Sequence, residues 1–490
     1  MHTLAIDQST AATKALIFDQ RGRLLCRADV PHRQITNDAG WVEHDPEEIW
    51  CNTLEACRLA LAMPGAESGA IGAVGISNQR ETAVCWDRAT GKPVYHAIVW
   101  QCGRAAGITD ALAAHGERIR QATGLSLSPF FSAAKFAWIV QNVKEAATLL
   151  RQGRLCCGTV DAWLLYRLTD GREFKTDYSN ASRTQLLNLD TLDWDDGMLS
   201  LFGLHRSALP QLCMSDSRFG ETSLGGLLGK PVPVHAMLGD SQAALYANGC
   251  RTPYAAKATF GSGTSVMMNI GGERPPSASR GVVESLAWGI GGSVSYVLEG
   301  NINYSGAIIK WLKDNLGIIA SAAETERLAY DAGSTGGVYF VPAFTGLGAP
   351  HWRNDLRAML CGMSPATNRA HIARAALEAI AYQIRDIAGE LEASCGRPIG
   401  ELCADGGAAA NGFLMQFTAD MLGCRLKISE TEELSAAGAA YLAAESAGIS
   451  DRETLRAAVS HRILLPAMRE EQRQSLYDGW KRSVTMLLKG

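Results

Sequence analysis

The stretch TLAIDQSTAATKALIFDQRGRLL, residues 3–25, places a polar segment between two apolar runs near the start of the chain. Residues 4–6 have the composition of a short buried strand, residues 12–19 that of a second strand, and residues 20–23 form a turn around Gly22. The pattern predicts an antiparallel hairpin whose loop is Asp7-Gln8-Ser9-Thr10. Such a loop offers backbone N–H groups and hydroxyls to an anion, next to a carboxylate that attracts a metal. An ordinary polar hairpin has the same pattern.

The bulk composition indicates a large globular protein. At 490 residues the chain is too long for a single ordinary core, so we expect two large domains or more. A hydrophobic content of 47% and a charged content of 20% are typical of folded proteins. A net charge of −4 gives no reason to expect a nucleic-acid partner.

The cysteine pattern and the lack of long apolar runs indicate in which cellular compartment the protein is expected. Thirteen cysteines are scattered along the chain without zinc-finger spacing, so we expect reduced thiols and a cytoplasmic location. The start MHTLAID lacks a basic stretch followed by an apolar core, and we expect no secretory signal. No run of about 18 apolar residues occurs, which predicts no membrane insertion.

The first half of the chain alternates strand-like and helix-like segments. In GWVEHDPEEIW, residues 40–50, a helix begins with Asp45 as N-cap, Pro46 at the first helical position and Glu48 three residues after the cap. This helix is expected to run to about Leu61. Residues 70–77 then predict a buried strand that enters the loop NQRET, residues 78–82. The alternation is typical of an α/β fold.

A second hairpin pattern occurs at residues 256–272, AKATFGSGTSVMMNIGG. Each hairpin is followed by a third predicted strand, at residues 23–30 and 285–287 respectively. We interpret this as an internal repeat of two similar domains, residues 1–248 and 249–490, with the boundary near residues 249–253. If each first loop faces a cleft between the domains, two phosphate-binding loops meet there, which is typical of a nucleotide-dependent phosphotransferase.

Two short motifs contain candidate catalytic and substrate-binding side chains. In GDSQAAL, Asp240 follows an apolar strand and precedes a helix, where a carboxylate can act as a general base or can simply cap the helix. In NQRET, Arg80 and Glu81 are able to hold neighbouring hydroxyls of a polyol, because one donates and the other accepts hydrogen bonds. A solvent-exposed ion pair is the alternative for these two residues.

Two glycine-rich motifs are candidates for binding a nucleotide. FGSGTS contains Ser262 between glycines, where the backbone can approach phosphate oxygens closely, although such a sequence also occurs in plain turns. ADGGAAANGF, residues 404–413, follows a strand and opens a helix, which suits nucleotide binding at a helix N-terminus.

Taken together, these segments resemble the FGGY family of carbohydrate kinases, and within it the glycerol kinase branch. The likeness is carried along nearly the whole chain by GWVEHDPEEIW, ISNQRETAVCWDRATGKPVYHAIVWQC, TDYSNASRTQLLNLDTLDWDD, VPAFTGLGAPHW and DGGAAANGFLMQF. Stretches similar to both family signatures are present, FFSAAKFAWIVQN at residues 130–142 and a second one at residues 358–378. The resemblance implies two RNase H-like α/β domains, of the actin, hexokinase and chaperone-ATPase superfamily, that flank a catalytic cleft.

The resemblance also implies a role for individual residues in transferring the γ-phosphoryl of ATP to a small polyol. Asp240 would be the general base, and Asp7 with Asp240 would hold Mg²⁺. Arg80, Glu81 and Trp100 would bind the polyol. The ATP-binding residues would be Thr10, Ala11, Lys14, Ser262, Gly306, Lys310, Gly407 and Asn411.

Three departures from the glycerol kinase pattern fall among the expected substrate-binding residues. Phe130 stands where those kinases have tyrosine, Ser241 where they have glutamine, and Ser265 where they have phenylalanine. A lost buried hydrogen bond costs about 0.5–1.5 kcal/mol, so the change at Phe130 would weaken glycerol binding about ten-fold at most. The two serines would enlarge the pocket and add polar partners. Glycerol therefore competes, as the expected substrate, with a four- or five-carbon polyol or ketose.

Two further expectations concern function and assembly. A catalytically silent nucleotide-binding protein of the same superfamily is an alternative, but the presence of Asp7, Asp240, Arg80 and Glu81 argues against it. Relatives form dimers and tetramers, so we expect a homodimer or homotetramer.

Overall fold

A computed structural model of the protein describes residues 1–276 and 278–489. Its internal contacts divide the chain into two compact units. Unit 1 comprises Met1–Gly249, Glu284–Tyr296 and Glu433–Ala458, and unit 2 comprises Cys250–Val283, Val297–Glu432 and Val459–Gly490. A single boundary between residues 248 and 249 does not describe this division, because two later segments pack with the first unit.

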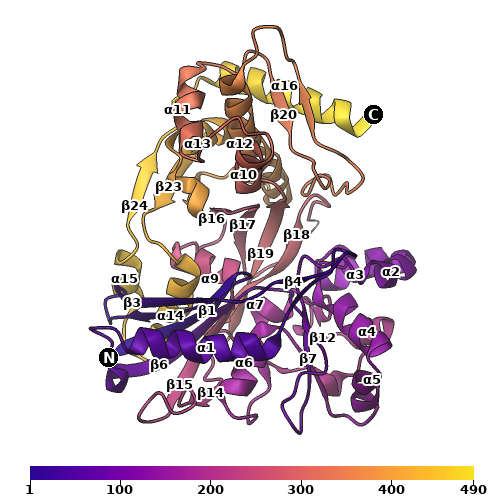
Figure 1. Ribbon diagram of the computed structural model, residues 1–490, viewed down its shortest axis with the longest axis vertical. Coiled ribbons are helices and arrows are strands. Elements are labelled where there is room, and N and C mark those ends of the chain that lie inside the picture. Colours follow the sequence, from indigo (N-terminus) through magenta and orange to yellow (C-terminus); the bar gives the residue numbers. More distant parts are fainter. Residues whose placement is uncertain (277, 490) are drawn as a thin grey trace. The chain divides into compact units, whose positions relative to one another are not determined.

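The core of unit 1 is a six-stranded sheet with the order β14-β15-β6-β1-β2-β3 (Figure 1). β1 is parallel to β6, and β6 is parallel to β15, whereas β2, β3 and β14 run antiparallel to their neighbours. The strands are β1 (His2–Gln8), β2 (Ala12–Phe18), β3 (Leu24–Pro31), β6 (Ile71–Asn78), β14 (Gly220–Thr222) and β15 (Val232–Gly239).

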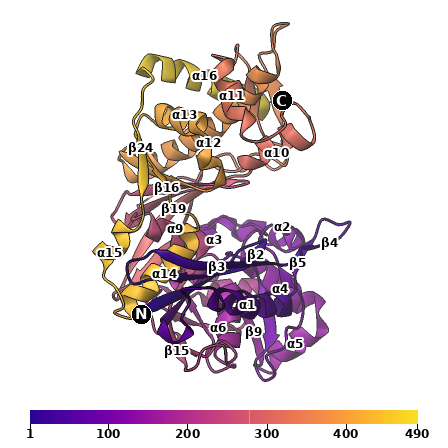
Figure 2. The same ribbon diagram turned by 60° about the vertical axis from the view of Figure 1, so that its left-hand side comes forward.

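Helices cover both faces of this sheet. Helix α1 (Pro46–Leu61) contributes Ile49, Ala56 and Ala60 to an apolar core that also contains Val74 and Ile76 of β6. Gly75, between those two strand residues, lies against the backbone of helix α14 (Leu434–Ser446) instead. Because successive strand residues point to opposite faces, α1 and α14 lie on opposite sides of the sheet. The two views show α14, near the end of the chain, beside β1 at its start (Figures 1 and 2).

The remaining elements of unit 1 are short and connect or flank the sheet. Its other strands are β4 (Ile35–Thr36), β5 (Val42–His44), β7 (Val84–Asp87), β8 (Ala97–Ile98), β9 (Leu155–Gly158), β10 (Lys175–Asp177), β11 (Leu187–Asn188), β12 (Asp193–Trp194) and β13 (Gln211–Cys213). Its other helices are η1 (Ser68–Ala70), α2 (Ala106–Ala111), η2 (Ala113–His115), α3 (Gly116–Thr123), α4 (Ser132–Asn142), α5 (Lys144–Arg151), α6 (Val160–Leu168), α7 (Tyr178–Ala181), α8 (Asp196–Phe202), η3 (Arg206–Ala208), α9 (Asp240–Ala247) and α15 (Arg452–Ala457).

The first hairpin forms as predicted, but its loop is shorter. Asp7 and Gln8 belong to β1 and face Lys14 and Thr13 of β2 across the ladder, so that only residues 9–11 form the loop. The strand is extended because β6 also pairs with Asp7 and Gln8 on the other side. Asp7 is therefore held by backbone pairing on both sides rather than by a free loop.

Helix α1 begins and ends where the sequence predicts. Asp45 accepts a hydrogen bond from the N–H of Glu47, and Pro46 occupies the first helical position. Glu48, three residues after the cap, does not complete a capping box with Asp45. Its carboxylate instead accepts hydrogen bonds from the backbone N–H and the Nε of Arg33, because β3 brings that arginine to the helix.

A second sheet, of seven strands, repeats the sheet of unit 1 with one strand added. The order β19-β17-β16-β22-β23-β24 matches β3-β2-β1-β6-β15-β14, and the pairings have the same parallel and antiparallel sense in β16–β17, β16–β22, β22–β23 and β23–β24. These strands are β16 (Ala256–Phe260), β17 (Thr264–Gly271), β19 (Ser293–Ile302), β22 (Glu401–Asp405), β23 (Arg425–Ser429) and β24 (His461–Leu464). The internal repeat and the two-unit α/β fold are confirmed.

One strand of the predicted repeat was assigned to the wrong position. Residues 285–287 lie in β18 (Val283–Ile290), which is the outermost strand of the sheet, and β19 takes the place beside β17. β18 and β19 are neighbouring long strands, and β19 also pairs with β17, the second strand of the hairpin. The order of strands in a sheet depends on such long-range pairing and not on the local sequence.

The other elements of unit 2 include the end of the chain. They are α10 (Gly306–Asp314), α11 (Glu324–Asp331), β20 (Tyr339–Val341), β21 (Met359–Cys361), α12 (Arg369–Cys395), η4 (Gly407–Ala410), α13 (Gly412–Leu422) and α16 (Glu470–Lys489). Residues 450–489 divide between the two units. In unit 2, α16 packs against α12 and α13 and β24 joins the sheet as an edge strand, whereas α15 belongs to unit 1.

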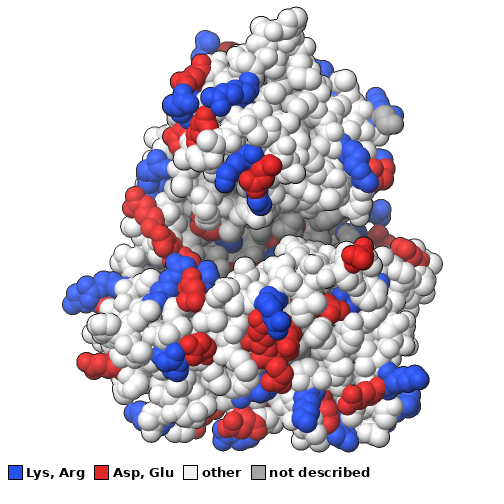
Figure 3. All heavy atoms as spheres, viewed as in Figure 1, with Lys and Arg blue, Asp and Glu red and all other residues white. Residues whose placement is uncertain are grey.

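The surface and the helices agree with a globular chain. On the face drawn in Figure 3, basic and acidic groups are interspersed, and many lie next to one another. Within residues 1–276 and 278–489, the helices are all too short or too polar to cross a lipid bilayer.

A close crossing of α9 and α14 depends on Gly438. A Cβ atom at Gly438 would lie 1.9 Å from the carbonyl oxygen of Ala243, which is backbone and cannot move aside cheaply. We expect Gly438→Ala to lower the free energy of unfolding by about 1–3 kcal/mol, as overpacking does. Gly389→Ala is the matched control, since Gly389 lies in α12 with open space around it. Urea unfolding should show a small gain for the control, and equal losses in the two variants would contradict the argument.

Candidate active site

The carboxyl ends of three parallel strands of unit 1 meet at one edge of the sheet. In the pairing register, Asn78 at the end of β6 lies between Gln8 at the end of β1 and Gly239 at the end of β15. Asp7, Arg80 and Asp240 are each within two residues of these positions. This edge is where ligands bind in open α/β sheets, because loops and helix N-termini converge there.

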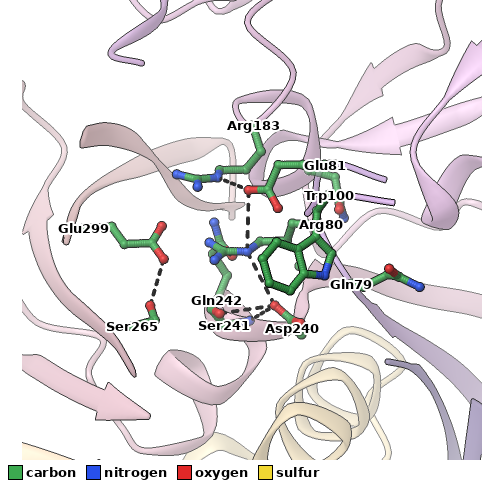
Figure 4. A network of polar contacts seen from close by, with 12 residues as sticks. Gln79, Arg80, Glu81, Trp100, Arg183, Asp240, Ser241, Gln242, Ser265 and Glu299 are labelled. Carbon is green, nitrogen blue, oxygen red and sulfur yellow. Dashed lines mark hydrogen bonds and ion pairs between the residues drawn. The ribbon is translucent and has the colours of Figure 1, made fainter. Parts of the chain in front are cut away.

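Asp240 is the first residue of α9 and points one of its oxygens at several donors (Figure 4). Oδ1 accepts hydrogen bonds from the backbone N–H of Ser241 at 2.6 Å and from its hydroxyl at 3.1 Å, and it lies 3.4 Å from Nε of Arg80. None of these three donors is directed at Oδ2. The side chain of Asp240 is 36% exposed, so this second oxygen is able to accept a proton from a ligand. The helix-capping alternative accounts for only the single bond to the N–H of Ser241.

Arg80 and Glu81 are buried, with side chains 7% and 3% exposed, so the alternative of a solvent-exposed ion pair is wrong. Arg80 Nε lies 4.0 Å from Glu81 Oε1. The principal partner of Glu81 is Arg183, whose Nε donates to Oε1 at 2.6 Å (Figure 4). The backbone of Glu81 has φ of 61°, a left-handed conformation that is costly for a residue with a side chain and occurs often at functional sites.

Asp7 is a buried carboxylate beside other charges. Burial raises the pKa of Asp7 to about 7, Lys14 opposes this rise, and the negative charges of Asp240 and Glu433 add to it. Its Oδ1 has no hydrogen-bond partner among the described residues. An unpaired oxygen beside a second carboxylate fits a divalent cation. Mg²⁺ commonly takes only one or two carboxylates and keeps water as its other ligands. In the described part of the chain no cluster of three or more metal-ligating side chains occurs.

The raised pKa predicts that Asp7 destabilises the metal-free protein at high pH. Between the ordinary value of 3.8 and about 7, the folded state keeps the proton and the unfolded state has lost it, so stability falls as pH rises. We expect Asp7→Asn to raise the free energy of unfolding by about 1–3 kcal/mol near pH 8 and to change it little near pH 4. Thermal unfolding of both proteins in chelator at the two pH values measures this. A loss of stability near pH 8 would contradict it.

The loop after β1 and the strand that follows it are held by polar contacts with other parts of unit 1. Lys14 Nζ lies 2.5 Å from Glu433, which precedes α14, and Arg27 contacts the same carboxylate at 3.0 Å. Thr10 accepts a hydrogen bond from the indole N–H of Trp100 at 2.9 Å, and Ala11 is exposed. The three residues expected to bind phosphate, Thr10, Ala11 and Lys14, thus lie together on the first hairpin.

Trp100 packs against a second aromatic side chain, and a buried lysine holds the backbone of that second residue. The ring of Trp100 lies 5.5 Å from that of Phe130 in an edge-to-face arrangement. Lys135 Nζ donates to the carbonyl oxygens of Phe130 and Phe131, and burial lowers the pKa of this lysine to about 7. Trp100 and Phe130 are only half-buried, so part of each side chain is available to a ligand.

Unit 2 contains a separate cavity of about 730 Å³. It is lined by all five of the residues of unit 2 that were expected to bind ATP, namely Ser262, Gly306, Lys310, Gly407 and Asn411. Other lining residues include Ala322, Thr325, Glu326 and Leu377. A mostly apolar cavity of this size, with a few polar groups, is suited to a nucleoside.

The cavity is built from loops and helix starts at the strand ends. The loop after β16 contacts the start of α10 closely, since a Cβ atom at Gly306 would lie 2.7 Å from the carbonyl oxygen of Gly261. Asn411 caps α13 by accepting from the N–H of Leu414, and its amide donates to Thr325. Lys310 is exposed and pairs with Asp314. The predicted strand–loop–helix arrangement of residues 404–413 is confirmed.

Ser265, the remaining expected substrate-binding residue, belongs to unit 2. Its hydroxyl donates to the carboxylate of Glu299 at 2.7 Å, and Glu299 is fully buried (Figure 4). Within unit 1 the structure brings together Asp7, Arg80, Glu81, Asp240 and Ser241, with Thr10, Trp100 and Phe130 nearby through the contacts described above. Arg183, Lys135, Glu433 and Glu299 were missed by sequence reasoning. Only Arg183 and Lys135 had a signal, as charged residues inside two of the family-like segments.

Comparisons with known proteins agree with this arrangement. The model for the N-terminal domain of the FGGY family of carbohydrate kinases matches residues 2–247, and the model for the C-terminal domain matches residues 247–447. The chain is 46% identical to glycerol kinase 1 of Thermotoga maritima over 100% of both chains. It is also 46% identical to a glycerol kinase of Symbiobacterium thermophilum, over 99% of this chain and 97% of the relative.

Solved structures have the same fold. The crystal structure of Plasmodium falciparum glycerol kinase with ADP is similar, with a TM-score of 0.94, 32% identity, and 99% and 98% of the two chains covered. A ligand-bound xylulose kinase from Lactobacillus acidophilus has a TM-score of 0.88 at 20% identity over 99% and 98% of the chains, which shows likeness of fold alone.

The chain therefore belongs to the FGGY family of carbohydrate kinases. It is an ATP-dependent kinase of a sugar or polyol, with the two-unit fold of the actin and hexokinase superfamily. Among the relatives, the similarity over the full chain is to glycerol kinases.

Proposed function

We propose that this kinase transfers the γ-phosphoryl of ATP to glycerol, forming glycerol 3-phosphate, with Asp240 as the general base. The observation that carries the chemistry is the carboxylate of Asp240, whose Oδ1 faces the two donors of Ser241 and the Nε of Arg80, while none of these three is directed at Oδ2. The substrate is supported by the full-length similarity to glycerol kinases at 46% identity.

In the proposed reaction, the terminal hydroxyl oxygen of the acceptor attacks the γ-phosphorus, and its proton passes to Oδ2 of Asp240. The bond between the γ-phosphorus and the bridging oxygen breaks, and ADP leaves with the electron pair. Positioning and charge stabilisation supply most of the rate enhancement in such transfers. Arg80 holds the carboxyl group of Asp240 in place through its contact at 3.4 Å.

Ligand binding divides between the two units in this proposal. Arg80 donates to hydroxyls of the acceptor, Glu81 accepts from them, and Trp100 packs against the carbons. The cavity of unit 2 binds the nucleoside, while Thr10, Ala11 and Lys14 contact phosphate oxygens. Asp7 and Asp240 would hold Mg²⁺, which when bound neutralises charge that develops on the phosphates.

A longer acceptor is the second candidate, and the Ser265–Glu299 hydrogen bond favours it. Ser265 stands where glycerol kinases carry phenylalanine, and behind its hydroxyl lies a buried carboxylate. Ser241 likewise adds a hydroxyl beside Asp240. If both serines face the acceptor, they offer hydrogen bonds to hydroxyls that glycerol lacks, as in a tetritol, a pentitol or a ketopentose.

An acceptor panel coupled to ADP release decides between these candidates. We expect glycerol to be phosphorylated, and we expect Phe130→Tyr to raise its kcat/KM by up to about ten-fold, the equivalent of one hydrogen bond. Ser265→Phe is expected to favour glycerol over erythritol, ribitol and xylulose. If the kcat/KM for a longer acceptor exceeds that for glycerol, the longer acceptor replaces glycerol as the proposed substrate. ATP binding without ADP release on any acceptor would overturn the proposed function and favour a silent nucleotide-binding protein.

The cellular location and the oligomeric state of the enzyme are part of the same proposal. All thirteen cysteines are free thiols, which supports a location in the reducing cytoplasm. The homodimer or homotetramer that the family resemblance implies stays a prediction.

A further inference from the structure

Helix α7 and the strand before it connect the two strand ends that carry Arg80 and Asp240. The segment TDYSNAS, residues 176–182, forms the end of β10, the whole of α7 and its C-cap, and every residue except Tyr178 is buried. None of these side chains has a role in the reaction described above. Two of them, Ser179 and Asn180, hydrogen-bond to β15 and β6 respectively.

Ser179 bonds to the residue immediately before the proposed base. Its hydroxyl accepts a hydrogen bond from the backbone N–H of Gly239 at 2.9 Å and donates to Asp177 Oδ1 at 3.0 Å. Gly239 is the last residue of β15 and the N-cap of α9. The direction in which the chain leaves the strand, and with it the position of the Asp240 carboxylate, is therefore fixed by this bond.

Asn180 bonds in the same way to the last residue of β6. Asn78 and Asn180 exchange two side-chain hydrogen bonds, from Asn78 Nδ2 to Asn180 Oδ1 at 2.9 Å and from Asn180 Nδ2 to Asn78 Oδ1 at 3.1 Å. Asn78 opens the NQRET loop, in which Arg80 follows two residues later. This reciprocal pair holds the start of the loop that presents Arg80 and Glu81.

Asp177 is the common anchor of both bonds. Its carboxylate accepts from the hydroxyl of Ser179, from the amide of Asn180 at 2.9 Å and from the hydroxyl of Ser215 at 2.6 Å. It also caps α7 by accepting from the backbone N–H groups of Ser179 and Asn180. Ser179 and Asn180, two adjacent residues of α7, are thus hydrogen-bonded to the ends of two neighbouring strands, β15 and β6.

We propose that Ser179 and Asn180 are positioning residues, which hold Asp240 and Arg80 in one relative geometry through Gly239 and Asn78. The inference rests on the proposed roles of Asp240 and Arg80. Ser179 acts through the base, so its loss affects the chemical step. Asn180 acts through the loop that binds the acceptor, so its loss affects acceptor binding first.

The test compares Ser179→Ala, Asn180→Ala and the control Ser182→Ala. Ser182 is a buried serine of the same segment. Its hydroxyl donates to the carbonyl oxygen of Ser179 and accepts from the N–H of Leu286, and neither of these residues is on β6 or β15. Each protein is assayed with the acceptor that the wild type uses best, chosen from polyols, ketoses and water. The wild-type preference tests the proposed function, and the variants test the positioning role on whichever acceptor is used.

We expect Ser179→Ala to lower kcat by about 10- to 100-fold, since small displacements of reacting groups have effects of that size, with the KM for ATP unchanged. Asn180→Ala is expected to raise the KM for the acceptor by about ten-fold with a smaller loss of kcat. Ser182→Ala should retain wild-type kinetics at a comparable loss of thermal stability. Equal kinetic losses in Ser179→Ala and Ser182→Ala would overturn the proposal.

A double-mutant cycle with Asp240→Asn separates positioning from general damage. If Ser179 acts through Asp240, the loss of its hydroxyl has no further effect on the residual rate of the Asp240→Asn protein. The same fold-loss in both backgrounds would overturn the positioning role. If Ser179→Ala does not fold, the KM shift in Asn180→Ala decides instead, and an unchanged KM there would overturn it.

Discussion

Replacing Asp240 by asparagine is expected to lower kcat by about a thousand-fold, within the range that loss of a general base produces, and to leave ATP binding intact. An asparagine oxygen at the position of Oδ1 still accepts from Ser241 and Arg80, so the fold around it is retained. The amide nitrogen at the position of Oδ2 has no lone pair for the acceptor proton. The nucleoside cavity of unit 2 does not include Asp240 among its lining residues.

The measurement is steady-state turnover with the preferred acceptor, together with ATP binding by calorimetry. Asp170→Asn is the control, since Asp170 is an exposed carboxylate of unit 1 whose partner is Arg172. It should have wild-type turnover. A rate for Asp240→Asn within about ten-fold of the wild type would remove Asp240 from the role of base, because general bases contribute more than that.

Local sequence signals predicted the elements that carry the site. The cap at Asp45, the two hairpins and the helix after residue 411 are each determined by residues within a few positions, and all are present in the structure. The motifs GDSQAAL and NQRET were likewise assigned to strand ends from their neighbours alone. What brings them together is the pairing of Asn78 with Gly239, which follows from the parallel order of β6 and β15.

The parts that the sequence did not predict depend on contacts between distant residues. Arg183 lies 102 positions from Glu81, and no spacing within TDYSNASRT indicates that its guanidinium contacts that carboxylate. Glu433 lies 419 positions from Lys14. Asp7 and Gln8 were assigned to the loop, but they pair with β2 and also with β6, a strand more than sixty residues away. Such errors are expected where tertiary pairing decides the outcome.

Arg183→Ala is expected to lower the free energy of unfolding by about 3–5 kcal/mol, since it leaves a buried carboxylate without its principal partner. Glu81 is 3% exposed, Arg183 donates to it at 2.6 Å, and Arg80 lies 4.0 Å away. Because the freed carboxylate would reorient, the KM for the acceptor should also rise by about ten-fold or more. The control is Arg58→Ala, which breaks an equally short pair with Glu55 at the surface. That change should cost less than about 1 kcal/mol.

Chemical unfolding of the two arginine variants tests the difference between a buried and an exposed pair, and similar losses would contradict it. The apolar replacement Arg183→Met with Glu81→Leu carries the argument further. Removing both charges leaves no unpaired ion in the interior, so most of the lost stability should return. Acceptor binding should not return with it, because the accepting carboxylate is gone. Recovery of stability without binding would show that the pair is present for ligand recognition, at a site where an apolar pair would serve the fold equally well.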